Sequence, residues 1–279
     1  MAVLGSTLTE IAYEKGGIIK PGKPVVIAPQ HEEAMTELVK LANERKSAFV
    51  QVENVYAYQE LSHTLSAQKV EVLRKEKTAA GEPKSLADTK LLLHLPLLGR
   101  HQMENAVTAL AALDELRRAG FKLTRRAVQQ GFRRVSWPAR FELLRRKPPF
   151  VIDSAHNGDS MRRLVETLDE YFPGKEFVLV FGASGDKELD AMLKIILPRV
   201  TNVVATQSIH PRAADADELG KLIEPYGKPT VAYHSLEEAL PAALKLAGKQ
   251  KGIIVTGSVF VAAGARVVWA EMHTRDQKQ

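Results

Sequence analysis

Residues 137–157 read WPARFELLRRKPPFVIDSAHN and join a proline break to a short apolar run that ends in polar side chains. The run at 150–152 has the β-branched and aromatic character of a buried strand. A helical pattern begins at Ser160, so the polar residues lie on a strand-to-helix loop, which is where open α/β sheets bind ligands. The polar residues of this loop are Asp153, Ser154, His156 and Asn157.

The same loop has a second interpretation. Asp, Ser and Asn are ordinary helix-capping residues, and His156 also suits an exposed loop position. Taken by itself, the stretch leaves a ligand site and a plain helix start both open.

Length and composition narrow the class of protein. The chain has 279 residues, 45% of them hydrophobic, which predicts one large domain or two ordinary ones. No apolar run approaches the roughly 20 residues needed to span a bilayer, and no signal-peptide pattern is present, so we expect a cytoplasmic protein without a membrane partner. The absence of cysteine excludes disulfides, thiolate metal sites and a cysteine nucleophile.

The net charge of +6, from 39 basic and 33 acidic residues, suits nucleic acid or anionic metabolites. We favour metabolites and expect no nucleic-acid partner. The basic residues are spread along the chain, and their densest groups lie on or between predicted helices without interleaved aromatic residues.

The periodicity predicts two α/β domains, residues 1–136 and 137–279. In the first, a helix capped by Ser6 or Thr7 precedes strands at 24–28 and 48–52 around a helix at 31–46. Antiparallel strands at 69–73 and 90–95, a helix of about 18 residues that ends at Gly120, and a shorter helix at 124–134 follow.

The second domain alternates strands and helices, which predicts a doubly wound, Rossmann-like sheet covered on both faces. The expected strands are 141–144, 150–153, 177–181, 202–205, 230–232 and 252–256. The expected helices are 160–171, 188–197, 216–223, 236–247 and 258–272.

Two further strands of this domain end in small and polar residues. Gly182, Ser184 and Gly185 permit close backbone approach and are followed by the opposite charges of Asp186 and Lys187. Near the end of the chain, Gly257-Ser258 opens the last helix, whose N-terminus favours an anion. Three such loops on one sheet edge predict a shared cleft.

Each loop also has a simpler explanation, because Asp186-Lys187 suits a solvated ion pair and Ser258 an ordinary N-cap. The absence of their motifs makes a nicotinamide enzyme, a P-loop protein, a metalloprotease and a serine hydrolase less suitable interpretations. The second half has no GxGxxG after its first strand, and the chain contains no GxxxxGK[ST], HExxH or GxSxG motif. From the residues alone, we predict a two-domain α/β protein with a cleft for an anionic small molecule.

Five segments in order resemble the folylpolyglutamate synthase and dihydrofolate synthase family of the Mur ligase superfamily. They are LGSTLTEIAYEKGGIIKPG (4–22), LLGRHQMENA (97–106), WPARFE (137–142), IDSAHN (152–157) and GASGDKELD (182–190), with TGS (256–258) after them. The resemblance implies the remainder of a P-loop-type ATPase domain followed by a Rossmann-like ligase domain. It also implies ATP and Mg²⁺ as cofactors, and L-glutamate with folate or dihydropteroate as substrates. Such ligases convert a carboxylate to an acyl phosphate, which the amino group of glutamate attacks.

The resemblance implies roles for individual residues. Lys15 matches a lysine whose carbamylation creates a carboxylate that helps to hold magnesium, although a lysine at a helix end is also favoured by the helix dipole. Asn105, Arg140 and Asp153 match nucleotide-contacting residues, with His101 as a secondary candidate. The residues that match the group orienting the incoming glutamate are His156, Lys187 and Ser258, and we take Lys15 and His156 as catalytic.

The resemblance also indicates which functional motifs of the family are absent from these 279 residues. The family's phosphate loop, its magnesium-binding serine and glutamate, and a histidine match positions upstream of Met1. Gly158 replaces an expected proline, a minor departure. We therefore expect the chain alone to be inactive as a ligase and to self-associate through its incomplete first domain. The alternative is a non-catalytic nucleotide- or glutamate-binding module. Folate preference and oligomeric state stay open.

Overall fold

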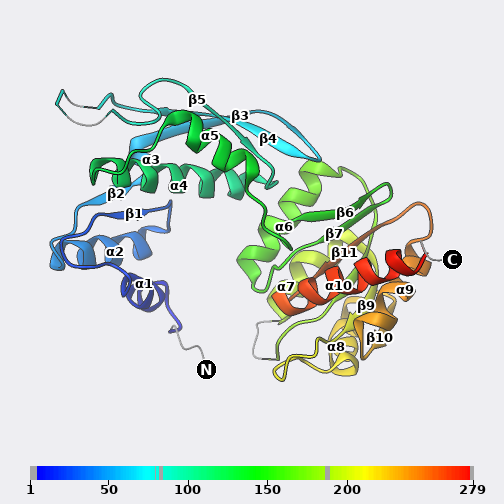
Figure 1. Cartoon of the computed structure of the whole chain (residues 1–279). Coiled ribbons are helices and arrows are strands. Elements are labelled where there is room, and N and C mark those ends of the chain that lie inside the picture. Colours follow the sequence, from blue (N-terminus) through cyan, green and yellow to red (C-terminus); the bar gives the residue numbers. More distant parts are fainter. Residues whose placement is uncertain (1–4, 79, 82–83, 186–188, 277–279) are drawn as a thin grey trace. The chain divides into compact units, whose positions relative to one another are not determined.

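The computed structural model of the protein describes residues 5–78, 80–81, 84–185 and 189–276 (Figure 1). The chain forms two compact units, one of residues 1–96 and 100–135 and the other of residues 97–99 and 136–279. Within the described residues, every helix is too short or too polar to cross a bilayer. The identity of the first unit as part of an ATPase domain stays a prediction.

The first unit begins with two helices beside a small parallel sheet. Helix α1 (Leu8–Gly16) starts at Thr7, whose hydroxyl accepts the Glu10 N–H at 3.1 Å in a reciprocal capping box. Strands β1 (Val25–Ile27) and β2 (Phe49–Gln51) are parallel and are joined through α2 (Glu32–Glu44). The predicted βαβ rhythm of this segment is confirmed.

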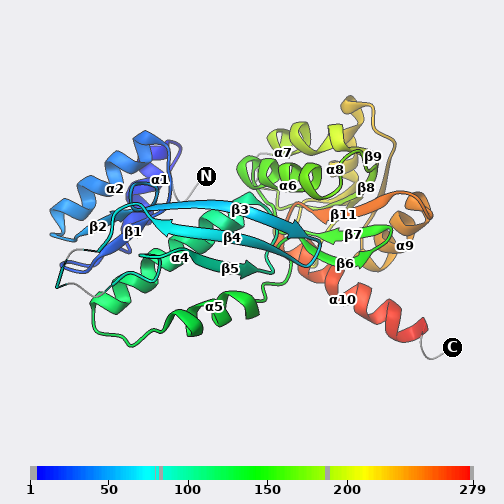
Figure 2. The same ribbon diagram turned by 90° about the horizontal axis from the view of Figure 1, so that it is seen from above.

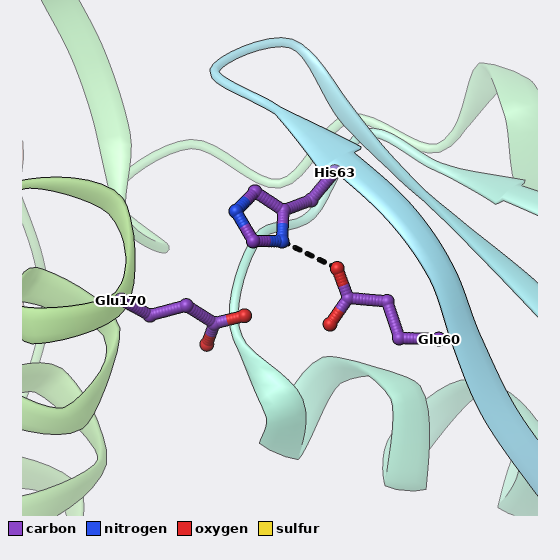
Figure 3. A group of neighbouring side chains, drawn as sticks. All are labelled: Glu60, His63 and Glu170. Atoms are coloured by element: carbon purple, nitrogen blue, oxygen red, sulfur yellow. Dashed lines mark hydrogen bonds and ion pairs between the residues drawn. The ribbon is translucent and has the colours of Figure 1, made fainter.

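A three-stranded antiparallel sheet follows a single turn of helix, α3 (Val52–Val55). Its strands are β3 (Tyr56–Thr64), β4 (Ala67–Arg74) and β5 (Leu91–Leu95), and α4 (Arg100–Arg118) and α5 (Arg125–Arg134) complete the unit. The sequence predicted β4 and β5 but missed β3, because most of its side chains are exposed and show no alternation. Near the end of β3, His63 Nδ1 contacts the Glu60 carboxylate (Figure 3).

A buried carboxylate ties the loop before β5 to α4. Asp114 is 4% exposed, and its Oδ2 accepts the Tyr56 hydroxyl at 2.7 Å and also the Ser85 hydroxyl. Its Oδ1 accepts the Leu86 N–H at 2.9 Å. Burial and the neighbouring carboxylate raise the pKa of Tyr56, so its hydroxyl stays a donor.

The second unit has a six-stranded sheet in the order β10-β9-β8-β11-β7-β6. The chain runs outward through β7, β8, β9 and β10, and β11 then returns between β8 and β7. These five strands are parallel, whereas β6 is antiparallel to β7. The strands are β6 (Glu142–Arg146), β7 (Pro149–Ile152), β8 (Phe177–Phe181), β9 (Val200–Thr206), β10 (Thr230–Tyr233) and β11 (Gly252–Thr256).

Helices cover both faces of this sheet, as the sequence predicted (Figure 2). Helices α9 (Leu236–Ala247) and α10 (Val259–Asp276) pack against a core that includes Phe150, Val180 and Val255. The opposite face carries α6 (Gly158–Tyr171), α7 (Leu189–Ile196) and α8 (Ala216–Ile223). The change of face at α9 accompanies the reversal of strand order, as right-handed crossovers require.

The first strand of this sheet differs from the expectation. It was expected at 141–144 in a doubly wound sheet, but β6 spans Glu142–Arg146 and forms an antiparallel edge. The link between β6 and β7 is too short for a helical crossover, so only an antiparallel hairpin can join them. As a result, the start of β6 lies beside the end of β7, where Glu142 pairs with Ile152.

Candidate functional site

A pocket of about 330 Å³ lies at the carboxyl edge of the six-stranded sheet. It forms where the loops after β7, β8, β9 and β11 meet the segment before β6. Its lining residues are Arg140, Ser154, His156, Ser184, Arg212, Gly257, Ser258, Val259 and Phe260. The predicted cleft shared by the loops after β7, β8 and β11 is therefore present. Asp186 and Lys187, which we expected in the same cleft, lie outside the described residues.

The lining of the pocket is cationic. Arg140 and Arg212 carry fixed positive charges, His156 adds an imidazole, and none of the described residues that line the pocket is acidic. The N-terminus of the 18-residue helix α10 also opens here. Guanidinium groups and a helix N-terminus both favour carboxylates and phosphates, so the pocket suits an anion with more than one acidic group.

Tight backbone packing fixes the position of the α10 N-terminus. Gly257 has φ +108°, and a Cβ there would lie 2.6 Å from the Gly182 carbonyl oxygen and 2.8 Å from the Phe181 ring. Only glycine fits at this position. Its N–H donates to the carbonyl of Ala155 at 3.1 Å, which ties the loop after β11 to the loop after β7.

Ser258 follows this glycine and is only 5% exposed. Its hydroxyl accepts the Phe260 N–H at 3.2 Å, so it caps the helix while it lines the pocket. The geometry therefore fits Ser258 both as a helix N-cap and as part of an anion-binding pocket.

His156 and Asn157 differ in their roles. His156 is exposed, and its Nδ1 lies 3.0 Å from the Ser154 carbonyl. Because a carbonyl only accepts, Nδ1 must carry a proton, and in the neutral ring Nε2 is then the basic nitrogen. Asn157 instead caps α6, with its Oδ1 accepting the Ser160 N–H at 2.8 Å. The helix-capping interpretation therefore describes Asn157 well.

Arg140 reaches the pocket from the segment before β6. Its guanidinium carbon lies 5.9 Å from the centre of the Trp137 ring, and Trp137 is 60% exposed. The residues on either side of Arg140 are both buried, whereas Arg140 itself is exposed. The turn therefore presents this side chain to the cleft.

Asp153 lies beneath that turn and does not line the pocket. Its Oδ2 accepts the Phe141 N–H and its Oδ1 accepts the Ala155 N–H, both at 2.8 Å. Burial raises the pKa of Asp153 to about 6, although the two N–H donors and the positive charges of Arg140 and His156 act in the opposite direction. The carboxyl thus titrates within the range of ordinary assay conditions.

The other candidates belong to the first unit. Lys15 is exposed in the last turn of α1. Asn105 is exposed on α4, and its Nδ2 donates to Gln102 Oε1 at 3.3 Å. The His101 ring, on the same helix, lies 2.9 Å from the Gln102 side chain. The functional roles implied for these residues stay predictions.

Arg212 is the charged lining residue that the sequence analysis missed. It lies in the loop after β9, which pairs with the loop after β8 through a bridge between Ser184 and Ala213. In the same loop, His210 stacks on Phe260 with ring centres 4.1 Å apart and accepts the Arg212 N–H at 3.2 Å. The available signal was HPR at 210–212, a basic and polar group beyond a strand end.

Comparisons with known proteins agree with this geometry. Residues 139–259 match the Mur ligase, glutamate ligase domain. The dihydrofolate synthase/folylpolyglutamate synthase of Bacillus subtilis is 28% identical over 275 residues, which cover 95% of this chain and 59% of the relative. The chain therefore spans about three-fifths of that relative's length.

Two solved structures show the same fold. The folylpolyglutamate synthase of Mycobacterium tuberculosis complexed with ADP is 29% identical with a TM-score of 0.83, over 96% of this chain and 60% of that one. A bifunctional folylpolyglutamate synthase/dihydrofolate synthase with Mn, AMPPNP and L-glutamate bound is 25% identical with a TM-score of 0.74, over 98% and 59%.

Proposed function

We propose that the chain functions in an ATP-dependent ligase that joins L-glutamate to a folate or dihydropteroate. The proposal rests on homology to the folylpolyglutamate synthase and dihydrofolate synthase family over about 95% of the chain's length. The second unit would hold glutamate and part of the nucleotide. The cationic pocket carries this proposal, because it offers two guanidinium groups, a histidine and a helix N-terminus without an opposing carboxylate among its described lining residues.

The proposed reaction has two steps. A substrate carboxylate oxygen attacks the γ-phosphorus of ATP, which forms an acyl phosphate and releases ADP. The amino nitrogen of glutamate then attacks the acyl carbon, phosphate leaves with the bonding electrons, and the nitrogen loses a proton as the amide forms. Catalysis of this kind depends mainly on positioning and on charge neutralisation.

The pocket residues would position the glutamate. Arg212 would pair with a carboxylate in bidentate geometry, and the helix N-terminus at Ser258 would receive an anionic oxygen. With Nδ1 protonated, the Nε2 of neutral His156 can accept a proton from the incoming ammonium group. The family resemblance suggests Lys187 as a further cation for glutamate.

Nucleotide and metal contacts are assigned by the family resemblance. Asn105, Arg140 and Asp153 would contact ATP, and Arg140 is suited to phosphate by its fixed charge. Lys15 has an exposed amine that carbon dioxide can reach, and its carbamylated form would help to hold Mg²⁺. Bound magnesium would neutralise the charge that develops on the transferred phosphoryl group.

One sequence observation favours a second candidate function. No GxxxxGK[ST] motif occurs in the 279 residues, so the chain has no motif of this kind to hold the β- and γ-phosphates. We therefore propose that the chain alone binds ligands without ligating them. In the alternative, this binding is its whole function.

Calorimetric titration of the purified chain with L-glutamate tests the pocket assignment. We expect saturable binding of L-glutamate and weaker binding of L-glutamine, which lacks the second carboxylate. Equal affinity for both amino acids would contradict the assignment. ATP-dependent addition of glutamate to a folate by the chain alone would contradict the proposed need for a further phosphate-binding part.

A further inference from the structure

The turn that carries Arg140 has an unusual backbone. Ala139 and Phe141, on either side of the arginine, have φ values of +60° and +44°. Among the described non-glycine residues, only Lys46 shares a positive φ. L-amino acids rarely adopt this left-handed region, and bulky side chains adopt it least readily. Neighbouring groups must therefore hold the turn in place.

Both flanking side chains are buried. Ala139 belongs to the core against α9 and α10, and the Phe141 ring lies 6.0 Å from that of Tyr171 and 6.4 Å from that of Phe172. Burial of both neighbours leaves the arginine between them facing the pocket. A change of either φ would redirect Arg140 as well as expose its neighbours.

Three hydrogen bonds hold the backbone of the turn. The Ala139 N–H donates to Glu142 Oε2 at 2.8 Å, and the Ala139 carbonyl accepts the Ser154 N–H at 2.9 Å. The Phe141 N–H donates to Asp153 Oδ2 at 2.8 Å. The Glu142 carboxylate is itself held from α10, because its Oε1 accepts Arg266 Nε at 3.0 Å.

We infer that Glu142 and Arg266 are positioning residues that hold Arg140 in its binding conformation. The inference rests on the proposed contact between Arg140 and the nucleotide. Neither residue is among those lining the pocket. Glu142 acts on Arg140 through the Ala139 N–H, and Arg266 acts through Glu142.

This role differs from that of an ordinary surface ion pair. The Glu142 and Arg266 side chains are 25% and 51% exposed, and a pair of that exposure contributes little to folding. The bond to Ala139 instead favours a left-handed conformation that an L-residue otherwise avoids. Loss of Glu142 should therefore lower ligand affinity through the turn, in addition to leaving the Ala139 N–H without its acceptor.

The test combines ADP titration by calorimetry with backbone ¹⁵N relaxation of the full chain. We expect Arg140→Ala to weaken ADP binding about tenfold or more, as loss of a charged hydrogen-bond partner does. Glu142→Ala should weaken it about fivefold, and Arg266→Ala should weaken it by a smaller factor. The heteronuclear NOE of the Arg140 and Phe141 amides should fall in both positioning variants.

Two further variants separate positioning from general stability. Ala139→Gly in the Glu142→Ala background should recover part of the lost affinity, because glycine adopts positive φ without penalty. If Glu142 only supported the fold, removal of the buried Ala139 methyl would weaken the protein further. As a matched control, Glu218→Ala removes an ion pair with Lys221 on α8, and ADP affinity should stay within about twofold.

The outcomes distinguish this inference from the proposed function. If Arg140→Ala weakens ADP binding and Glu142→Ala does not, the positioning role is wrong and the nucleotide contact stands. If Arg140→Ala leaves ADP affinity unchanged, the proposed contact is wrong. In that case the relaxation data test the positioning role by themselves. Heteronuclear NOE values of the 139–141 amides that are as high in Glu142→Ala as in the wild-type protein would overturn it. Should that variant not fold, the same comparison applies to Arg266→Ala, which leaves the Glu142 carboxylate without its partner from α10.

Discussion

Replacement of Asp153 by asparagine should change how the stability of the second unit depends on pH. The carboxyl has a pKa of about 6 in the folded protein and about 3.8 as its reference value. Between these values the folded state keeps the proton that the unfolded state has lost. Stability attributable to Asp153 is therefore present at low pH and is lost as the pH rises towards and past 6.

The size of the effect follows from the difference in pKa. A rise from 3.8 to about 6 is roughly two units, and at about 1.36 kcal/mol per unit it corresponds to about 3 kcal/mol. The amide that replaces the carboxyl does not titrate in this range, so this contribution disappears in the variant. The amide also loses one acceptor for the Phe141 or Ala155 N–H, a cost of about 1–3 kcal/mol that does not vary with pH.

Urea unfolding from pH 4 to 7.5, followed by tryptophan fluorescence, measures the effect. Trp137 and Trp269 are the chain's two tryptophans and both lie in the second unit. The wild-type protein should lose about 2.4 kcal/mol relative to Asp153→Asn across this range, because at pH 4 the carboxyl of the unfolded chain is already about half ionised. If the difference in the free energy of unfolding between the two proteins were the same at every pH, the reasoning would be refuted.

A matched substitution on the surface should behave in the opposite way. Asp190 hydrogen-bonds Tyr226 and forms an ion pair with Lys194 at 2.6 Å, and these partners lower its pKa. Its ionised form therefore stabilises the folded state above the unfolded pKa. Relative to Asp190→Asn, the wild-type protein should gain stability as the pH rises, which provides a control of opposite sign.

Three further predictions test the pocket and its surroundings. Arg212→Ala should weaken L-glutamate binding about 10- to 100-fold by calorimetry, because it removes a charged hydrogen-bond donor, and unchanged affinity would exclude Arg212 from the site. Gly257→Ala should destabilise the second unit by about 3 kcal/mol or more in urea unfolding, since its Cβ would lie 2.6 Å from the Gly182 oxygen; a loss below about 1 kcal/mol would contradict the packing. Incubation with ¹³C-bicarbonate should give a carbamate NMR signal that Lys15→Arg abolishes, and a signal that persists in the variant would assign it to another amine.

Much of the second unit could be predicted because its parallel strands are buried on both faces. Strands such as β8 and β11 are continuous apolar runs, bounded by glycine and charged residues, and this pattern has few alternatives. Polar residues beyond three of these strands then indicated the sheet edge that holds the pocket. The prediction depended on topology, which brings all parallel strand ends to one edge.

The missed parts depend on contacts that a local pattern does not contain. Strand β3 is held by pairing with β4 from Tyr56↔Arg74 to Thr64↔Ala67, while most of its side chains are exposed, so its sequence lacks alternation. Arg212 belongs to the pocket through the bridge between Ser184 and Ala213, a contact between two loops. The positive φ of Ala139 and Phe141 likewise has no local sequence signal, because neither is glycine.

The antiparallel direction of β6 explains why Arg140 lines the pocket at all. A parallel first strand would begin at the amino edge of the sheet and would place the preceding turn far from the loops after β7 and β11. In the hairpin, Glu142 pairs with Ile152, so the turn at 139–141 lies beside Asp153 and within reach of its carboxylate. The edge strand and the left-handed turn therefore act together: the first brings Arg140 to the correct edge, and the second directs its side chain into the cleft.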